Sequence, residues 1–154
     1  MDLSELLRPE AVTSVAKAVS KKRLLQDIAG LAASVYDVDA DAAFDALQER
    51  ESLGPTGVGE GVALPHARLF GLTSVVGVFL RLETPIDYDS VDRKPVDLIF
   101  ALFAPVDSGV EHLKALALVS RLMRESGARA KLRANNDSAT LYAILTEITA
   151  TRAA

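Results

Sequence analysis

The spacing of apolar residues predicts two helices in the first third of the chain. Apolar side chains in the segment Lys21–Tyr36 recur at i, i+4, i+7 and i+11, which is the pattern of one face of an amphipathic helix. Ser20 is expected to cap this helix, because a serine oxygen can accept a hydrogen bond from a free first-turn amide. A second helix is expected to begin at Asp39 or Asp41 and to end before Gly54-Pro55, a pair typical of helix ends.

The central part of the chain carries the strand pattern. Ser74–Leu82 and Val96–Phe103 are apolar at successive positions, which predicts two strands buried on both faces of a sheet. Val12–Val15 predicts a short edge strand, and Val62–Leu64 predicts another short strand. Residues 83–89 are expected to form an irregular connection between the two buried strands.

Helical spacing returns in the last third. Ser108 and Glu111 match a capping box, in which each side chain satisfies a free amide at a helix start. The buried stripe of the helix that follows is expected to comprise Leu113, Leu116, Ala117, Ser120 and Met123, widened by Leu118 and Leu122. Residues 128–134 predict a short basic helical turn.

A final helix completes the pattern, capped by Asp137 or Ser138, and residues 149–154 are expected to fray. Its apolar face is expected to comprise Leu141, Ile144, Leu145 and Ile148. The order of helices, strands and helices predicts an α/β (α+β) fold. In that fold a mixed β-sheet of about five strands is sandwiched between helices on both faces. The length of 154 residues suits one domain over 1–154.

The composition excludes several classes of function. The net charge is −4 and no run of lysine and arginine offsets it, so nucleic-acid binding is not expected. The absence of cysteine excludes disulfides, thiolate nucleophiles and cysteine-ligated metals. The first residues do not match a signal peptide, and the apolar runs are far shorter than the roughly 20 residues that span a bilayer. We therefore expect a cytoplasmic protein without membrane insertion.

One stretch, Gly54–Arg68, is dense in glycine. It holds four glycines and one of the two histidines, His66, within fifteen residues. Such density marks positive φ angles or close backbone approach, and free amides in such a loop can cradle an anion. The stretch lacks the Gly-Lys-Ser/Thr ending of a P-loop, and Gly57, Gly59 and Gly61 lack the spacing of a dinucleotide-binding fingerprint.

Three side chains are candidates to complete an anion site here. His66 lies behind the glycines at the end of a short strand, and His112 lies in the first turn of a helix, where amides favour an anion. Arg50 lies just before the glycines, and a guanidinium binds phosphate oxygens with two donors. Each of the three residues also has a non-functional interpretation. A lone histidine is most often structural or merely exposed, and a surface arginine contributes little to stability through its ion pairs.

Two other kinds of site are not supported. The histidines are 46 positions apart and no third ligand has characteristic spacing, so no metal site is predicted. A serine hydrolase is not predicted either, because there is no Gly-x-Ser-x-Gly motif.

The segment Thr56–His66, Thr-Gly-Val-Gly-Glu-Gly-Val-Ala-Leu-Pro-His, resembles the phosphorylation-site motif of mannitol/fructose-type enzyme IIA (EIIA) domains. These domains belong to the bacterial phosphoenolpyruvate-dependent phosphotransferase system. Further segments resemble its nitrogen-regulatory branch, enzyme IIA-Ntr, and the similarity runs from about Leu3 to Ile148. These segments are Ser20–Arg23, Gly77–Ile86, Pro95–Leu102 and His112–Leu116.

The resemblance implies a role for each candidate residue. His66 would accept a phosphoryl group from the histidine of an HPr-like carrier, called NPr in the nitrogen branch. His112 would orient His66 or its phosphate through a hydrogen bond, and Arg50 would lie beside the site. No cofactor is implied. The phosphate contacts would be completed by Thr56, Gly57, Gly59 and Gly61.

The resemblance also leaves alternatives open. A regulatory phosphocarrier would act on targets such as transporter or sensor kinase components, whereas a metabolic sugar EIIA would pass phosphate to a separate IIB component. An interaction module that has lost transfer is a third reading, disfavoured by the retained histidines and arginine. Pro55 and Ala67 depart from the family's usual serine and glycine, which affects the expected loop geometry. Val62, Leu64 and Leu113 are candidates for an apolar surround of His66.

Overall fold

The computed structural model describes the backbone of residues 1–153 and the side chains of residues 1–147. After two 3-10 turns, one strand, two helices, five strands and three helices follow in the described part of the chain. The strands are β1 (Val12–Val15), β2 (Gly57–Gly59), β3 (Val62–Ala63), β4 (His66–Leu69), β5 (Val76–Ile86) and β6 (Val96–Pro105). The helices are η1 (Leu3–Glu5), η2 (Pro9–Ala11), α1 (Lys21–Tyr36), α2 (Ala40–Ser52), α3 (Val110–Met123), α4 (Ser126–Arg133) and α5 (Ser138–Ala153).

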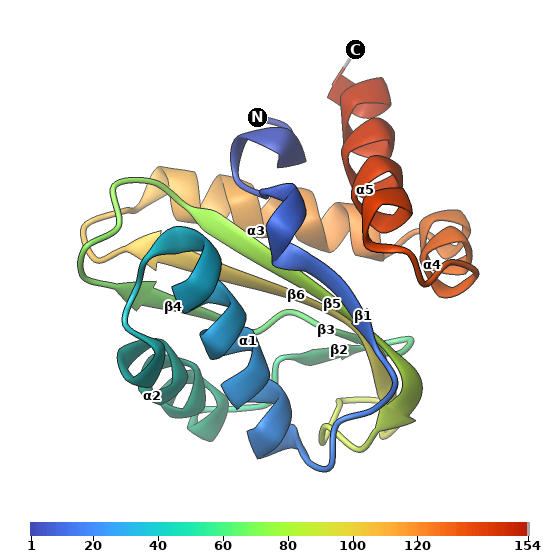
Figure 1. The fold of residues 1–154 in the computed structure, drawn as a ribbon, viewed down its shortest axis with the longest axis horizontal. Helices are drawn as coiled ribbons and strands as arrows, with labels where there is room; N and C mark the ends of the chain where they lie inside the picture. Colours follow the sequence, from blue (N-terminus) through green and yellow to red (C-terminus); the bar gives the residue numbers. More distant parts are fainter. Residues whose placement is uncertain (154) are drawn as a thin grey trace.

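The strands form one mixed sheet in the order β1-β5-β6-β3-β2, with β4 also paired to β6 (Figure 1). β1 runs parallel to β5, β5 runs antiparallel to β6, and both β3 and β4 run parallel to β6. Six strands replace the five or so expected, because β2 and β4 were not predicted. The fold class itself is confirmed.

β3 and β4 follow one another along the same edge of β6. Val62 pairs with Leu98 and His66 pairs with Leu102, so the two short strands are collinear and separated only by Leu64 and Pro65. The carbonyl of Pro65 still accepts a hydrogen bond from the amide of Leu102, at 3.0 Å. The interruption therefore makes His66 the first residue of a new strand.

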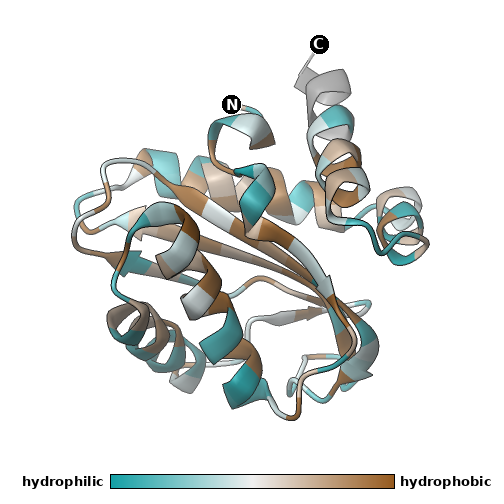
Figure 2. Cartoon of the chain, viewed as in Figure 1, coloured by the Kyte–Doolittle hydropathy of each residue, from teal (hydrophilic) through white to brown (hydrophobic). Residues whose placement is uncertain are grey.

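Helices cover both faces of the sheet. Figure 1 shows α1 and α2 in front of the strands and α3 behind them, with α4 and α5 beside β1. The apolar residues are concentrated along β5 and β6, between these helix layers, while the first turn of α1 is hydrophilic (Figure 2). Phe79, Phe100 and Phe103 are fully buried in this core. The sandwich predicted from the order of elements is thus confirmed.

The helix caps in the first and last parts of the chain agree with the sequence. Ser20 accepts from the amide of Arg23, and Asp39 caps α2 through the amide of Ala42. Asp137 accepts from the amide of Thr140 at the start of α5. Leu141 and Leu145 are buried as expected and Ile144 is partly buried; the side chain of Ile148 lies outside the described residues.

Three predictions are wrong. The strand β5 does not end at Leu82 but continues to Ile86, because Thr84 donates its amide to Ala16 and Ile86 pairs with Val96. The expected fraying at 149–154 is replaced by helix through Ala153, and Ala154 lies outside the described residues.

The third error concerns the start and the buried face of α3. Gly109, not Ser108, is the N-cap, so the helix begins one residue later than the capping box requires, and glycine has no side chain to cap it. The buried stripe is shifted accordingly, so Leu113 and Ala117 of the expected stripe are exposed. The residues that α3 buries are His112, Ala115, Val119, Leu122 and Met123.

Gly61 provides a test of how tightly the glycine stretch is packed. Its φ is +78°, and a Cβ there would lie 2.9 Å from Oδ1 of Asp97 and closer still to the guanidinium of Arg133. We expect Gly61→Ala to lower the free energy of unfolding by more than about 1 kcal/mol, measured by urea denaturation. Gly30→Ala is the control, because Gly30 lies in α1 with no atom near a new Cβ and should gain about 0.5–1 kcal/mol. Equal effects of the two substitutions would contradict this account.

Candidate functional site

The two histidines, distant in sequence, lie side by side in the structure. The ring centroids of His66 and His112 are 5.7 Å apart and the rings are inclined by 72°. The pairing of Leu69 with Pro105 explains the approach, because the chain leaves β6 there and soon enters α3. The first turn of α3 therefore lies beside β4 and brings His112 to His66.

Side chains along β4 alternate between the two faces of the sheet, and this alternation decides which of them lie on the same face as His66. Ala67 and Leu69 are buried, whereas His66 is half-buried and Arg68 is exposed. Because successive side chains of a strand point to opposite faces, His66 and Arg68 share the face away from the core. The guanidinium of Arg68 donates to the carbonyl of Ser108 at 3.0 Å, just before α3.

His66 is held by its own main chain. Its Nδ1 lies 2.9 Å from the carbonyl oxygen of Leu64, which can only accept a hydrogen bond. In the neutral ring, Nδ1 therefore carries the proton and Nε2 has the free lone pair. This contact leaves Nε2 as the ring nitrogen of His66 whose lone pair is free.

His112 is buried, with 8% of its surface exposed, and its Nε2 has no hydrogen-bond partner among the side chains that the structure describes. Burial, followed by the charges of His66 and Arg68, lowers the pKa of His112. His112 is therefore a neutral imidazole at neutral pH. A buried polar atom without a partner is unusual, and it points to a group that the site receives.

Arg68 belongs to the surroundings of the site, although its side chain was not singled out from the sequence. The signal was present, because a residue two positions after His66 shares its face in a strand. Residues 66–69 were not predicted to be a strand, since four residues with one histidine and one arginine carry no clear alternation of apolar side chains. The omission of β4 therefore hid Arg68.

Arg50 lies in the last turn of α2 and is tied to the glycine stretch. Its Nη1 donates to the carbonyl of Gly54 at 2.9 Å. Among the described side chains it makes no hydrogen bond to either histidine. The structure thus brings His66 and His112 together, and it places Arg50 at the start of the loop that leads to His66.

The predicted loop residues have partners within the protein. The hydroxyl of Thr56, which is 4% exposed, hydrogen-bonds to Glu51 and lies 3.2 Å from the hydroxyl of Tyr88. A Cβ on Gly57 would lie 3.0 Å from the Cα of Ser90, and one on Gly59 would lie 3.4 Å from the carboxylate of Asp92. Close neighbours within the chain therefore account for glycine at 57, as they do at 61.

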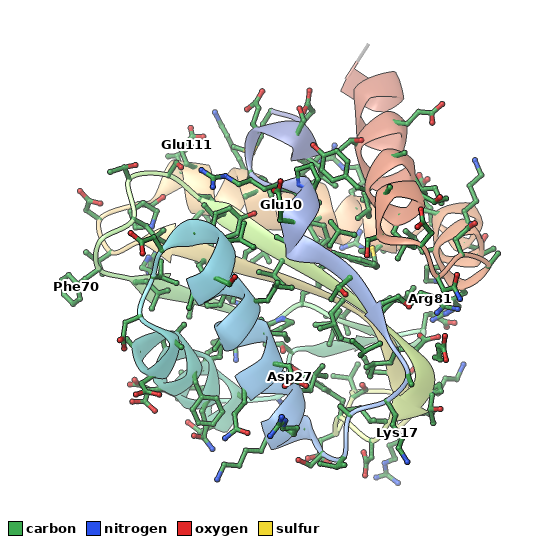
Figure 3. The ribbon with its side chains drawn as sticks, viewed as in Figure 1. Glu10, Lys17, Asp27, Phe70, Arg81 and Glu111 are labelled. Carbon is green, nitrogen blue, oxygen red and sulfur yellow. The ribbon has the colours of Figure 1, made fainter. Side chains whose placement is uncertain are left out.

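Several exposed apolar residues lie close to the histidines in the sequence. Phe70, 87% exposed, follows β4 and projects away from the molecule in Figure 3, and Leu113, 68% exposed, follows His112. Val106 and Val110 are also exposed on the connection to α3 and on its first turn. By contrast, Val62 and Leu64, which were candidates for the surround of His66, are buried in the core.

Two searches among the described residues bear on other functions. No helix there is long and apolar enough to cross a membrane. No group of three or more histidine, cysteine, aspartate or glutamate side chains there is arranged to hold a metal ion.

Comparison with known proteins places the chain in a family. The family described as "Phosphoenolpyruvate-dependent sugar phosphotransferase system, EIIA 2" matches residues 5–148. A nitrogen regulatory protein from Bradyrhizobium diazoefficiens is 45% identical over 145 residues, which cover 94% of this chain and 95% of the relative.

Two solved structures share the fold. Nitrogen regulatory protein IIA-Ntr from Neisseria meningitidis matches with a TM-score of 0.84 and 34% identity over 92% of this chain and 97% of that chain. The complex of enzyme IIAMTL and phosphorylated enzyme IIBMTL from Escherichia coli matches with a TM-score of 0.74. At 15% identity, over 91% of this chain and 98% of that chain, it shows likeness of fold alone.

These matches confirm the resemblance to the nitrogen-regulatory branch. Proteins called nitrogen regulatory protein are homologues of this chain over nearly its full length. The chain belongs to the type 2 EIIA family of the phosphoenolpyruvate-dependent sugar phosphotransferase system.

Proposed function

We propose that this protein is a regulatory phosphocarrier that receives a phosphoryl group on Nε2 of His66 from a phosphohistidine of an HPr-like carrier, NPr. The observation that supports this most directly is the bond between His66 Nδ1 and the carbonyl of Leu64, which leaves Nε2 unprotonated and free to attack. Membership of the EIIA family, whose members interact with phosphocarrier proteins, supports the same reaction.

The transfer needs positioning more than covalent machinery. The lone pair of His66 Nε2 forms a bond to phosphorus as the phosphorus–nitrogen bond of the carrier breaks and its electron pair returns to the carrier's ring. The ring of His66 gains positive charge in this step. The Leu64 carbonyl, which accepts from Nδ1 at 2.9 Å, stabilises that charge.

His112 is proposed to donate a hydrogen bond to the arriving phosphoryl group. Its ring lies next to that of His66, and its Nε2 is buried without a partner among the described side chains. A phosphoryl oxygen would satisfy this atom in the tautomer that carries a proton on Nε2. The dianion would also favour protonation of His112, because an opposite charge nearby raises the pKa of a histidine.

Two arginines can supply positive charge near this anion. Arg50 uses one Nη for Gly54 and retains other N–H donors, and Arg68 acts on His112 through its charge. The contacts of Thr56, Gly57, Gly59 and Gly61 with phosphate stay a prediction. For Thr56 a direct contact is disfavoured, because Glu51 already accepts from both its amide and its hydroxyl.

The exposed apolar residues that flank the histidines in the sequence suit the approach of a carrier protein. They are Phe70, Val106, Val110 and Leu113, which we call the apolar rim. Apolar side chains at the centre of an interface exclude water, and here they would limit hydrolysis of the phosphohistidine. A regulatory output is supported by the relatives called nitrogen regulatory proteins, while transfer to a sugar IIB component is the competing outcome.

We expect His66→Ala to abolish phosphorylation. The purified protein would be incubated with labelled phosphoenolpyruvate, enzyme I and the HPr-like carrier, and the wild type should acquire an acid-labile, base-stable label. Undiminished label on His66→Ala would place the acceptor elsewhere. Onward transfer to an added sugar IIB component, tested in the same reaction, would favour the metabolic alternative.

His112 should make stability depend on pH. Because its pKa is lowered in the folded state, the unfolded chain binds a proton as pH falls through about 6.5 while the folded protein does not. The free energy of unfolding should fall over this range, and the loss should level off below the lowered pKa. Denaturation at about pH 7.5 and 5.5 should show a larger loss for the wild type than for His112→Gln. An identical pH dependence would exclude the buried neutral His112.

The apolar rim should control recognition of the carrier. We expect Leu113→Asp to raise the KM for the phosphorylated carrier roughly 10-fold, with kcat nearly unchanged, because Leu113 touches the partner and not the reacting atoms. Val19→Asp is the control, since Val19 is also exposed and is two positions from Lys17, which lies far from Phe70 in Figure 3. If both substitutions raise KM equally, the effect is one of charge and not of docking at the rim.

A further inference from the structure

A buried carboxylate lies behind the glycine stretch. The side chain of Glu51, in the last turn of α2, is 6% exposed. Both its oxygens lie 3.2 Å from the amide nitrogen of Thr56, and Oε1 also accepts from the hydroxyls of Thr56 and Tyr88. Lys21 Nζ forms an ion pair with Oε2 at 2.8 Å. Glu51 thus binds three segments: the start of α1, the glycine stretch and the connection after β5.

The partners of this carboxylate are hydrogen-bond donors and one cation. Tyr88 is fully buried, and burial followed by the charge of Glu51 raises the pKa of its hydroxyl, which stays protonated and can donate. Lys21 lies 4.4 Å above the ring of Tyr88 and belongs to the Ser20–Arg23 motif, for which phosphoryl transfer gave no role. A buried ion pair is weak support for stability, since desolvation offsets much of its attraction. A gain in stability therefore does not by itself account for the buried carboxylate of Glu51.

A continuous chain of contacts leads from Glu51 to the nucleophile. Glu51 holds the amide and hydroxyl of Thr56, and the carbonyl of Thr56 accepts from the amide of Leu64 at 2.9 Å. The carbonyl of Leu64 then accepts from Nδ1 of His66 at 2.9 Å.

We propose that Glu51 is a positioning residue for His66, acting through Thr56 and Leu64 to fix the carbonyl that sets the tautomer and orientation of the imidazole. This role rests on the proposed phosphorylation of His66. In the proposed positioning role, Thr56 acts on His66 through its main chain and does not act on the phosphate.

The need for such an anchor follows from the gap between β3 and β4. Leu64 lies outside both strands, so the ladder with β6 does not fix its carbonyl. The contact with Thr56 does this instead, and Glu51 holds Thr56 from the rigid end of α2. Because each step crosses a saturated Cα atom, the chain transmits position and not electronic polarisation. A misplacement of about 1 Å can cost roughly 100-fold in rate, so such positioning bears directly on transfer.

The test compares Thr56→Val with Thr56→Ser in the full chain. Valine keeps the shape but removes the hydroxyl that Glu51 holds, whereas serine keeps it. Nitrogen-15 spectra of the unphosphorylated protein would give the share of His66 protonated on Nε2, and stopped reactions would give kcat and KM for the phosphorylated carrier. We expect Thr56→Val to raise the Nε2-protonated share and to lower kcat about 10-fold at unchanged KM, and Thr56→Ser to stay near wild type.

Glu51→Gln is a second test of the same role. It should also raise the Nε2-protonated share of His66, and it should lower kcat further, by up to about 100-fold. Asp97→Asn is the matched control, because Asp97 pairs with Arg133 against the same glycine stretch, at Gly61, but has no contact with Thr56 or Leu64. It should lower the melting temperature and leave the His66 tautomer unchanged. The proposal is overturned if the folded Thr56→Val and Glu51→Gln proteins keep the wild-type tautomer and kcat, or if Asp97→Asn shifts the tautomer equally.

The tautomer is measured without phosphate, so this proposal can fail separately from the proposed function. A wild-type protein that shows the Nδ1-protonated tautomer but accepts no phosphate would contradict phosphorylation of His66 alone. A protein that is phosphorylated on His66, with a tautomer insensitive to Thr56 and Glu51, would contradict the positioning role alone.

Discussion

The hydrogen bond from His66 Nδ1 to the carbonyl of Leu64 is the contact on which the site depends. It is possible because the strand beside β6 is interrupted at Leu64 and Pro65. Pro65 directs its carbonyl to Leu102, and neighbouring carbonyls of an extended chain point to opposite edges, so that of Leu64 is free for a side chain. A continuous strand would not offer this acceptor beside the imidazole. The break in the sheet therefore determines which ring nitrogen of His66 keeps a free lone pair.

The charges around the histidines oppose the charge of the whole protein. The chain has a net charge of −4, and a phosphoryl group adds about −1.5 to −2 more. Arg68 brings positive charge to His112 and Arg50 brings it to the start of the glycine stretch, while the carboxylate of Glu51 is paired with Lys21 behind the loop. Interactions between charges more than roughly 10 Å apart are screened by salt. Nearby positive side chains can therefore favour an anion, although the net charge of the protein is negative.

The sequence predicted most of the fold, because its long elements carry strong periodicity. The cap at Ser20 and the strand Val96–Phe103 needed no tertiary information. β4 and β2 were missed because their pairing with β6 and β3 comes from contacts distant in sequence. For the same reason the motif identified His66 and His112 but not the tautomer, Arg68 or the role of Glu51. These depend on which backbone carbonyl or carboxylate lies beside each group.

The separation between main-chain and side-chain roles explains how the fold can persist while sequences diverge. The acceptor of His66 is a backbone carbonyl, and its position depends on the break between β3 and β4 and on the loop that Thr56 anchors. Such geometry tolerates exchange of most side chains, in keeping with a similar fold at 15% identity in a mannitol EIIA structure. Exposed side chains such as those of Phe70 and Leu113, in contrast, can change without disturbing the core. If these residues recognise the carrier as proposed, the same histidine geometry could be presented to different partners.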